Sequence, residues 1–189
     1  MKRFDGRSVV VTGAGSGIGA ACVKRLVEEG AQVVAVDVSQ EGVDAAKAGV
    51  CAPERVHGAV LDVMDHAAAL ALIAEMRRKL GTLNGLVNCA GITGIGSIID
   101  TDPDKHRKIM GVNLDGTINM CQAFVQAVKD DKTPRAIVNI SSGAGILGVA
   151  NRLSYVASKF GISGISKSMA PELGPLGIRV NAVAPGVTR

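Results

Sequence analysis

The sequence contains no tryptophan and few other aromatic residues: one tyrosine and three phenylalanines make up 2% of its 189 residues. Many nucleic-acid-binding proteins stack bases on aromatic side chains, so this shortage argues against nucleic acid as a partner. The net charge of +4, from 21 basic and 17 acidic residues, fits basic groups on solvated helix faces, as at residues 77–79. We therefore expect no nucleic-acid-binding surface.

Long apolar runs are also missing. No stretch approaches the ~20 residues that a membrane-spanning helix needs, and the first residues lack the apolar core of a signal sequence. The three histidines are dispersed and the cysteines lack metal-like spacing, so we expect no metal site. We expect a cytoplasmic protein with no membrane partner and with reduced thiols, which are Cys22, Cys51, Cys89 and Cys121.

The chain does contain 47% hydrophobic residues and 24 glycines, enough for one core in one domain. Apolar, β-branched runs alternate with helix-like segments, an order typical of an α/β fold with a parallel sheet and helices on both faces. No repeat or linker interrupts this order, so we expect a single domain over residues 1–189. The pattern predicts strands at 8–12, 32–36, 55–60, 84–88, 135–140 and 178–183, and helices that include 65–80, 103–130 (interrupted near Gly111) and 154–173, bent at Pro171.

Glycines crowd the junction between the first predicted strand and a helix over residues 20–29. Thr12 is followed by a loop in which every second residue from 13 to 19 is glycine. Glycine allows left-handed dihedral angles and close backbone approach, and the free amides at a helix start attract phosphate. The loop therefore predicts a cradle for a dinucleotide pyrophosphate, although glycines can also mark a simple turn. The residues assigned to this cradle are Gly13, Ser16, Gly17, Ile18 and Gly19.

Asp37 ends the second predicted strand, 18 residues after Gly19. A dinucleotide-binding fold places at this position the carboxylate that accepts hydrogen bonds from the adenosine ribose. A 2′-phosphate would meet like charge there, and the neighbouring residues supply no arginine or lysine to receive it. Asp37 therefore favours NAD over NADP; the alternative is an aspartate that only caps the following helix.

Three polar residues, Ser142, Tyr155 and Lys159, complete the pattern. Tyr155 and Lys159 are four residues apart, so on a helix they lie on one face. A phenol ionises only near pH ~10, but a neighbouring positive charge favours its ionised form. Tyrosine as general acid and base, lysine beside it and serine as hydrogen-bond donor indicate a proton-transfer site. Each residue alone also has a structural explanation, as a strand-end hydroxyl or a surface charge.

Together these motifs resemble the short-chain dehydrogenase/reductase family, in its single-domain branch, over residues 4–189. The resemblance implies a Rossmann-type doubly wound parallel sheet with strand order 3-2-1-4-5-6 and an NAD-dependent oxidoreductase that interconverts a secondary alcohol and a ketone. The family's catalytic residues fall on Asn113, Ser142, Tyr155 and Lys159. Its further cofactor contacts fall on Asp62, Val63, Asn88, Ala90, Gly91, Pro185, Gly186, Val187 and Thr188, and Tyr155 and Lys159 contact the cofactor as well.

The resemblance also assigns roles. Ser142 would orient the substrate oxygen, Tyr155 would remove the hydroxyl proton, and Lys159 would bind the nicotinamide ribose. Asn113 would help to hold a water on the path of the departing proton. Cys89 stands where the family pattern has a second asparagine, and we expect little consequence, because cysteine is small and readily buried.

Family members continue for several dozen residues past the proline–glycine segment. The resemblance therefore implies a missing seventh strand and substrate loop. We expect the natural chain to continue past Arg189, because an edge strand exposed by deletion invites aggregation. It also implies a homo-oligomer, dimer or tetramer, paired through residues 103–130 and 154–173.

The substrate is not identified by the sequence. Residues 92–96 and 143–147 are expected to form apolar walls that suit a small or moderately hydrophobic alcohol or carbonyl compound, and Arg152 offers a contact for an anionic group. An acyl-carrier reductase fits less well, because such family members tend to use NADPH. The alternatives are a catalytically impaired NAD-binding scaffold or sensor, and a lyase or epimerase, which Ser16 in place of a glycine disfavours.

Overall fold

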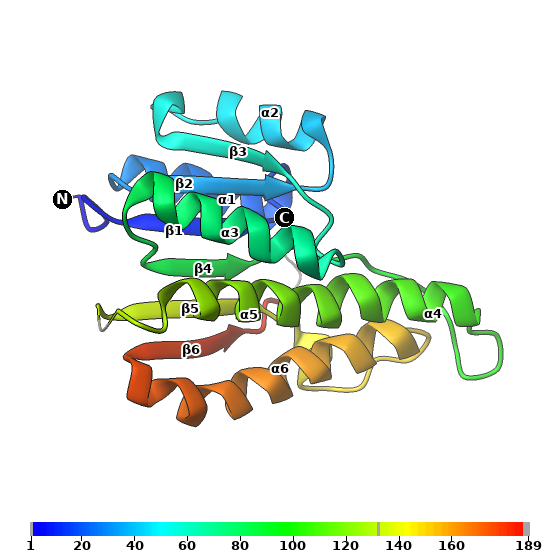
Figure 1. Cartoon of the computed structure of the whole chain (residues 1–189). Helices are drawn as coiled ribbons and strands as arrows, with labels where there is room; N and C mark the ends of the chain where they lie inside the picture. The colour runs from blue at the N-terminus through cyan, green and yellow to red at the C-terminus, as the bar shows by residue number, and fades with distance from the viewer. Residues whose placement is uncertain (1, 132, 187–189) are drawn as a thin grey trace.

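The structure is a computed structural model that describes residues 2–131 and 133–186. It forms a six-stranded parallel sheet in the order β3-β2-β1-β4-β5-β6, so the predicted Rossmann-type topology is confirmed (Figure 1). The predicted contacts Val187 and Thr188 lie outside the described residues. The strands are β1 (Ser8–Thr12), β2 (Gln32–Asp37), β3 (Val56–Val60), β4 (Gly85–Asn88), β5 (Arg135–Ile140) and β6 (Ile178–Val183). The helices are α1 (Gly17–Glu28), α2 (Gln40–Ala48), α3 (His66–Leu80), α4 (Pro103–Met110), α5 (Gly116–Val128) and α6 (Leu153–Leu173).

Apolar side chains pack on both sides of the sheet. α1 and α2 cover β1, β2 and β3 on one face, while α5 and α6 contact β4, β5 and β6 on the other (Figure 1). All five residues of β1 are buried, as expected for a strand between two helical layers. In β5, by contrast, burial alternates along the strand, and in β6 only Ile178 and Val180 are buried. Among the described elements, helices therefore cover mainly one face of these two strands.

The predicted element boundaries agree with the structure to within a few residues. α1 begins at Gly17, three residues earlier than expected, so the last glycines of the loop belong to its first turn. α3 begins after Asp65, whose side chain caps the helix by accepting a hydrogen bond from the Ala68 amide at 2.9 Å. Pro171 lies in the last turn of α6. No helix of the described chain has both the length and the apolarity to span a bilayer.

The predicted interruption near Gly111 is a π-helical turn, η2 (Gly111–Asp115), which joins α4 to α5. Such turns place one extra residue in a helix and occur often at functional sites. The turn faces inward at Asn113, whose side chain has no solvent exposure. Gly116, just after the turn, is needed for close packing, because a Cβ there would lie 2.5 Å from Val63 Cγ2.

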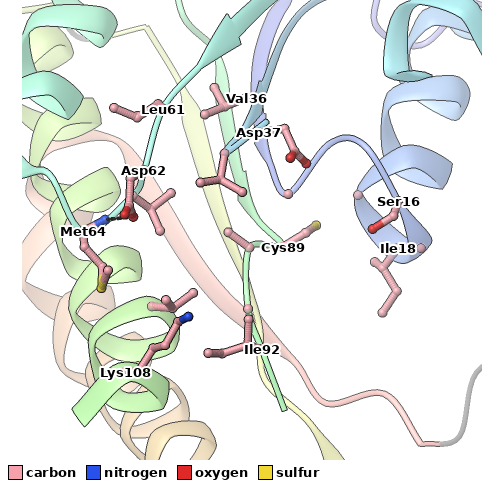
Figure 2. A pocket seen from close by; sticks show the side chains of 18 residues that line it. Ser16, Ile18, Val36, Asp37, Leu61, Asp62, Met64, Cys89, Ile92 and Lys108 are labelled. Carbon is pink, nitrogen blue, oxygen red and sulfur yellow. Dashed lines mark hydrogen bonds between the residues drawn. The ribbon is translucent and has the colours of Figure 1, made fainter. Parts of the chain in front are cut away.

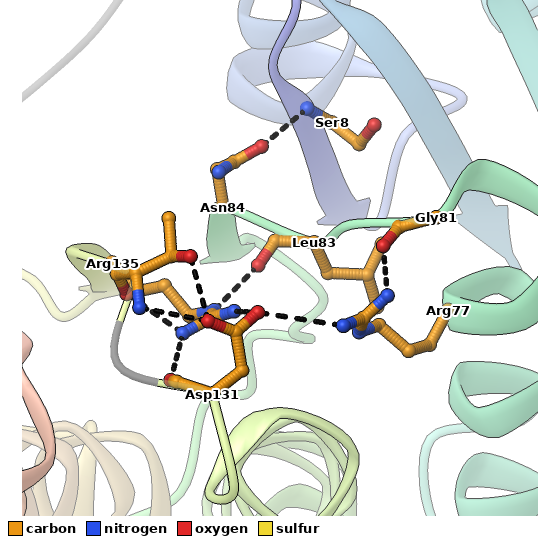
Figure 3. A network of polar contacts seen from close by, with 8 residues as sticks. Ser8, Arg77, Gly81, Leu83, Asn84, Asp131 and Arg135 are labelled. Carbon is orange, nitrogen blue, oxygen red and sulfur yellow. Dashed lines mark hydrogen bonds and ion pairs between the residues drawn. The ribbon is translucent and has the colours of Figure 1, made fainter.

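A polar network lies at the edge of the sheet where the strands begin, its amino edge (Figure 3). Arg135, buried at the start of β5, donates hydrogen bonds to the carbonyls of Leu83 at 2.9 Å and Thr133 at 2.7 Å. It also pairs with the Asp131 carboxylate at 2.5 Å. Arg77 reaches that carboxylate from α3 at 3.4 Å. The network therefore ties α3, the segment before β4 and the start of β5 together.

Candidate active site

A cavity of about 590 Å³ opens at the carboxyl edge of the sheet (Figure 2). It lies where the strand order reverses between β1 and β4, the place where ligands bind in open α/β sheets. The sequence predicted ten of its lining residues, from four separate segments: Gly13, Ser16, Gly17, Ile18, Gly19, Asp37, Asp62, Val63, Ala90 and Gly91.

The glycine loop has the geometry of a phosphate cradle. Gly13 and Gly17 have φ angles of 61° and 50°, in the left-handed region that favours glycine. A Cβ on Gly19 would collide with the Gly13 carbonyl, so the loop folds tightly onto the first turn of α1. The Ser16 side chain makes no capping hydrogen bond, which leaves the first amides of α1 available for an anion. A dinucleotide pyrophosphate fits this loop.

Asp37 lies at the end of β2, on the wall of the cavity. Its carboxylate accepts hydrogen bonds from the Gly15 amide at 2.9 Å and the Ser39 amide at 3.2 Å. Ser39, not Asp37, caps α2, because the Ser39 hydroxyl accepts the Gly42 amide at 3.0 Å. The capping alternative therefore fails. The Ser39 hydroxyl also donates to this carboxylate, at 3.3 Å. A carboxylate has about four acceptor positions, so Asp37 retains one for a ribose hydroxyl.

The segment after β3 forms the adjoining wall. The Asp62 carboxylate accepts the Met64 amide at 2.9 Å, and Asn119 of α5 donates to the Val63 carbonyl at 3.0 Å. Lys108 and Val112, four residues apart and so on one helical face, reach the cavity from α4 and η2. Figure 2 shows Lys108 on the opposite side of the cavity from Asp37. The sequence analysis did not select Lys108, and its spacing from Val112 is the only local signal for it.

The segment after β4 supplies the floor. The Thr12 hydroxyl accepts the amides of Cys89 and Ala90, each at 3.1 Å, and so joins the end of β1 to this segment. Asn88 points instead into the sheet, where its amide donates to Asn139 at 2.9 Å. Asn88 therefore lies beneath the cavity and does not line it, while Cys89, Ala90 and Gly91 do.

A second cleft, of about 270 Å³, continues the first one. The two share Ile18, Cys89, Gly91 and Ile92 as lining residues. The second cleft also brings together five residues that the sequence predicted from distant segments: Ser142, Tyr155, Lys159, Pro185 and Gly186. The Gly143 amide donates to the Pro185 carbonyl at 2.8 Å, which holds the serine loop against the segment after β6.

Lys159 and Tyr155 lie on one face of α6, as predicted. The Lys159 Nζ atom is 5.7 Å from the centroid of the Tyr155 ring. This atom donates a hydrogen bond to the Ile140 carbonyl at 2.9 Å, and Lys159 as a whole is 5% exposed. Burial, which disfavours the charged ammonium, lowers the pKa of Lys159 to about 8.

Asn113 holds this arrangement together from the π-helical turn. Its side chain accepts the Ile92 amide at 2.7 Å and donates to the Ile92 carbonyl at 2.9 Å. It also donates to the Ser158 hydroxyl at 3.0 Å, and that hydroxyl donates to the Tyr155 carbonyl. A Cβ on Gly91 would lie 3.2 Å from Asn113 Oδ1 and 3.6 Å from Lys159 Nζ. Asn113, Gly91 and Lys159 are therefore close neighbours.

Two loops border the cleft on the outside. Arg152 donates to the Thr93 hydroxyl at 2.7 Å and pairs with Gly96 in a parallel bridge, so its guanidinium holds the loop after β4. Both loops expose large apolar side chains: Ile95 is 80% exposed, Ile146 62% and Leu147 70%. The two loops therefore carry exposed apolar side chains, and their role as walls of a substrate site stays a prediction.

Comparisons with known proteins identify the family of the chain. A family model described as short chain dehydrogenase matches residues 7–189. The chain is 37% identical over 188 residues to levodione reductase from Leifsonia aquatica, covering 97% of this chain and 70% of that protein. It is also 37% identical over 188 residues to meso-2,3-butanediol dehydrogenase from Serratia marcescens, covering 99% and 73%. The crystal structure of NAD+-bound xylitol dehydrogenase matches with a TM-score of 0.94 at 31% identity, covering 98% of this chain and 72% of that one. The chain belongs to the short-chain dehydrogenase/reductase family of oxidoreductases.

Proposed function

We propose that the chain is an NAD-dependent oxidoreductase that interconverts a secondary alcohol and a ketone. One observation supports this most: the cleft of Ser142, Tyr155 and Lys159 opens directly into the cavity formed by the glycine loop and Asp37. A nicotinamide ring placed at their junction would supply the hydride acceptor. The NAD+-bound state of the xylitol dehydrogenase structure supports a nicotinamide cofactor.

The side chains have hydrogen-bonding capacity for the proposed chemistry. The Ser142 hydroxyl accepts the Ala144 amide at 3.1 Å, so its own proton is free to hydrogen-bond the substrate oxygen. Lys159 uses one of its three donors on Ile140 and keeps two for the nicotinamide ribose hydroxyls. Tyr155 then removes the substrate hydroxyl proton as general base. Asn113, beside Gly91 and Lys159, is proposed to hold a water through which that proton leaves.

The preference for NAD rests on Asp37. Its carboxylate lies on the cavity wall, and the one lysine among the lining residues, Lys108, lies across the cavity from it. A 2′-phosphate at Asp37 would therefore meet negative charge without a cation to balance it. The exposed apolar side chains of the two loops that carry Ile95 and Leu147 support a small or moderately hydrophobic substrate.

We also propose that the protein is a cytoplasmic homo-oligomer, with its four free cysteines consistent with a reducing compartment. The pairing surface would be the outer faces of α5 and α6, where Ile118 is 40% exposed and Phe160 45%. Sedimentation velocity tests it: Phe160→Glu should lower the measured mass to that of the monomer. Lys47→Glu, on the exposed side of α2, should not, and a monomeric wild type would contradict the proposal.

The catalytic assignment is tested with Tyr155→Phe, followed by NADH absorbance against a panel of secondary alcohols and ketones. Loss of a general base should lower turnover by about 100-fold or more. The affinity for NAD should stay within a few-fold, because the phenol contributes little to binding. A variant that retains activity would refute the role of Tyr155, and tight NAD binding without turnover in the wild type would favour the scaffold alternative.

A further inference from the structure

Cys22 and Cys89, distant in the sequence, meet beneath the cofactor cavity. Cys22 is on the second turn of α1, and Cys89 follows β4 directly. Both pack against the same apolar cluster, and each thiol shifts the pKa of the other. Figure 2 shows the Cys89 sulfur directed toward α1.

The lining of the cavities places the two cysteines independently. Ile18, one helical turn before Cys22, lines both the cofactor cavity and the catalytic cleft together with Cys89. Val87, whose side chain points to the same side of the sheet as that of Cys89, lines a further cavity together with Cys22. We propose that Cys22 and Cys89 are an oxidation-sensitive thiol pair, which hydrogen peroxide converts to a disulfide that weakens cofactor binding.

Cys22 is suited to be the attacking thiol. It is half-buried and borders a cavity of about 670 Å³ that offers a small oxidant access. The neighbouring Cys89 thiol lowers the pKa of Cys22 to about 7, although burial opposes this. The neighbouring Cys22 thiol and its own burial raise the pKa of Cys89, so Cys89 keeps its proton. Thiolate character and access together set the susceptibility of a cysteine to peroxide.

The reaction balances with one peroxide per pair. The Cys22 thiolate attacks one peroxide oxygen, so an S–O bond forms, the O–O bond breaks, and the released hydroxide takes a proton to become water. The Cys89 sulfur then attacks the Cys22 sulfenic acid. An S–S bond forms, the S–O bond breaks, and the hydroxyl leaves with the Cys89 proton as a second water. Two electrons pass from the sulfurs to the peroxide.

The disulfide would act on the cavity through the backbone of Cys89. The Cys89 and Ala90 amides are fixed to the Thr12 hydroxyl, each at 3.1 Å. A Cβ on Gly13 would lie 2.9 Å from Ala90 Cα and 3.1 Å from the Cys89 carbonyl carbon. The glycine loop therefore has no free space against this segment. Drawing Cys89 toward α1 must displace either the loop or Ile18.

The disulfide is tested by titrating the full chain with hydrogen peroxide, blocking remaining thiols with iodoacetamide and mapping cross-linked peptides by mass spectrometry. We expect a pair of peptides joined by a disulfide between Cys22 and Cys89, and dithiothreitol should cleave this link. Cys51→Ser, which removes an exposed thiol, should leave it unchanged. Cys22→Ala and Cys89→Ala, checked for folding by circular dichroism, should each abolish it. Alkylation of both residues after peroxide treatment, or a link through Cys121 instead, would overturn the proposal.

The effect on the cofactor rests on the proposed function and is measured separately, by calorimetric titration of NAD into the reduced and oxidised Cys51→Ser protein. Sites coupled in this way typically change affinity by about fivefold or more, and we expect a weakening of that size in the oxidised form. Dithiothreitol should restore the affinity. An unchanged affinity in a protein with the mapped disulfide would overturn the coupling. Absence of NAD binding to the reduced protein would instead count against the proposed function, while the mapped disulfide would stand.

Discussion

Lys159 and Tyr155 stack on one face of α6, with the Lys159 Nζ atom 5.7 Å from the centroid of the Tyr155 ring. Lys159 is almost completely buried, and within residues 2–131 and 133–186 its ammonium has one acceptor, the Ile140 carbonyl at 2.9 Å. Burying a charge opposite a single neutral acceptor is unfavourable. The site therefore keeps a cation where the fold alone would not favour one, which is expected when function requires it.

This burial predicts a specific dependence of stability on pH. Burial lowers the pKa of Lys159 from its ordinary value of 10.5 to about 8. Between these two pH values the unfolded chain binds more protons at this site than the folded chain, so the contribution of Lys159 to stability rises with pH. Below pH 8 its destabilising effect is fully present.

The measurement compares the wild type with Lys159→Met in urea unfolding at pH 7.0 and pH 9.5. The free energy of unfolding of the wild type, relative to the variant, should increase by about 2 kcal/mol over this interval. The comparison cancels the titration of groups common to both proteins. A difference that stays constant between the two pH values would show that Lys159 is not desolvated as described.

Asp37 predicts the choice of coenzyme. Asp37→Ala removes the acceptor for the ribose hydroxyls and the negative charge that repels a 2′-phosphate, so NAD should bind more weakly while NADP gains relative to it. The ratio of the two dissociation constants should change by about tenfold, the effect of 1.4 kcal/mol. Asp62→Ala is the matched control, because Asp62 lines the same cavity and should affect both coenzymes alike. An unchanged ratio in Asp37→Ala would remove the basis for the NAD preference.

Much of the fold and of the candidate cofactor cavity could be predicted because the signals are local. The β-branched run of β1, the glycines that follow and Asp37 at the end of β2 all lie within one strand–helix–strand unit. Tyr155 and Lys159 are fixed relative to each other by helical spacing alone. Ser142 is brought to Tyr155 and Lys159 only by the fold, so spacing could not predict its place beside them. The family resemblance predicted it.

Other features depend on partners that are remote in the sequence. The interruption near Gly111 was predicted, but its π-helical form depends on the hydrogen bonds of Asn113 to Ile92 and Ser158. The packing of Cys22 and Cys89 against one apolar cluster has no local signature, because only the fold brings α1 and the segment after β4 to the same cluster. The expectation that Cys89 has little consequence stays a prediction, and the proposed thiol pair is the alternative to it.

The contacts of Arg135 indicate that substitutions at the amino edge of the sheet will strongly lower the free energy of unfolding. Its guanidinium is completely buried, and it binds the carbonyls of Leu83, Asp131 and Thr133 as well as the Asp131 carboxylate. Removing one partner of a buried, hydrogen-bonded ion pair costs about 3–5 kcal/mol, because the remaining groups lose their partners. Arg135→Ala should therefore lower the free energy of unfolding by about 3 kcal/mol or more. Arg77→Ala, which removes a longer and partly exposed ion pair to the same carboxylate, should cost about 1 kcal/mol. Urea unfolding of the two variants measures the difference, and equal losses would mean that the carboxylate, not the buried carbonyls, governs this network.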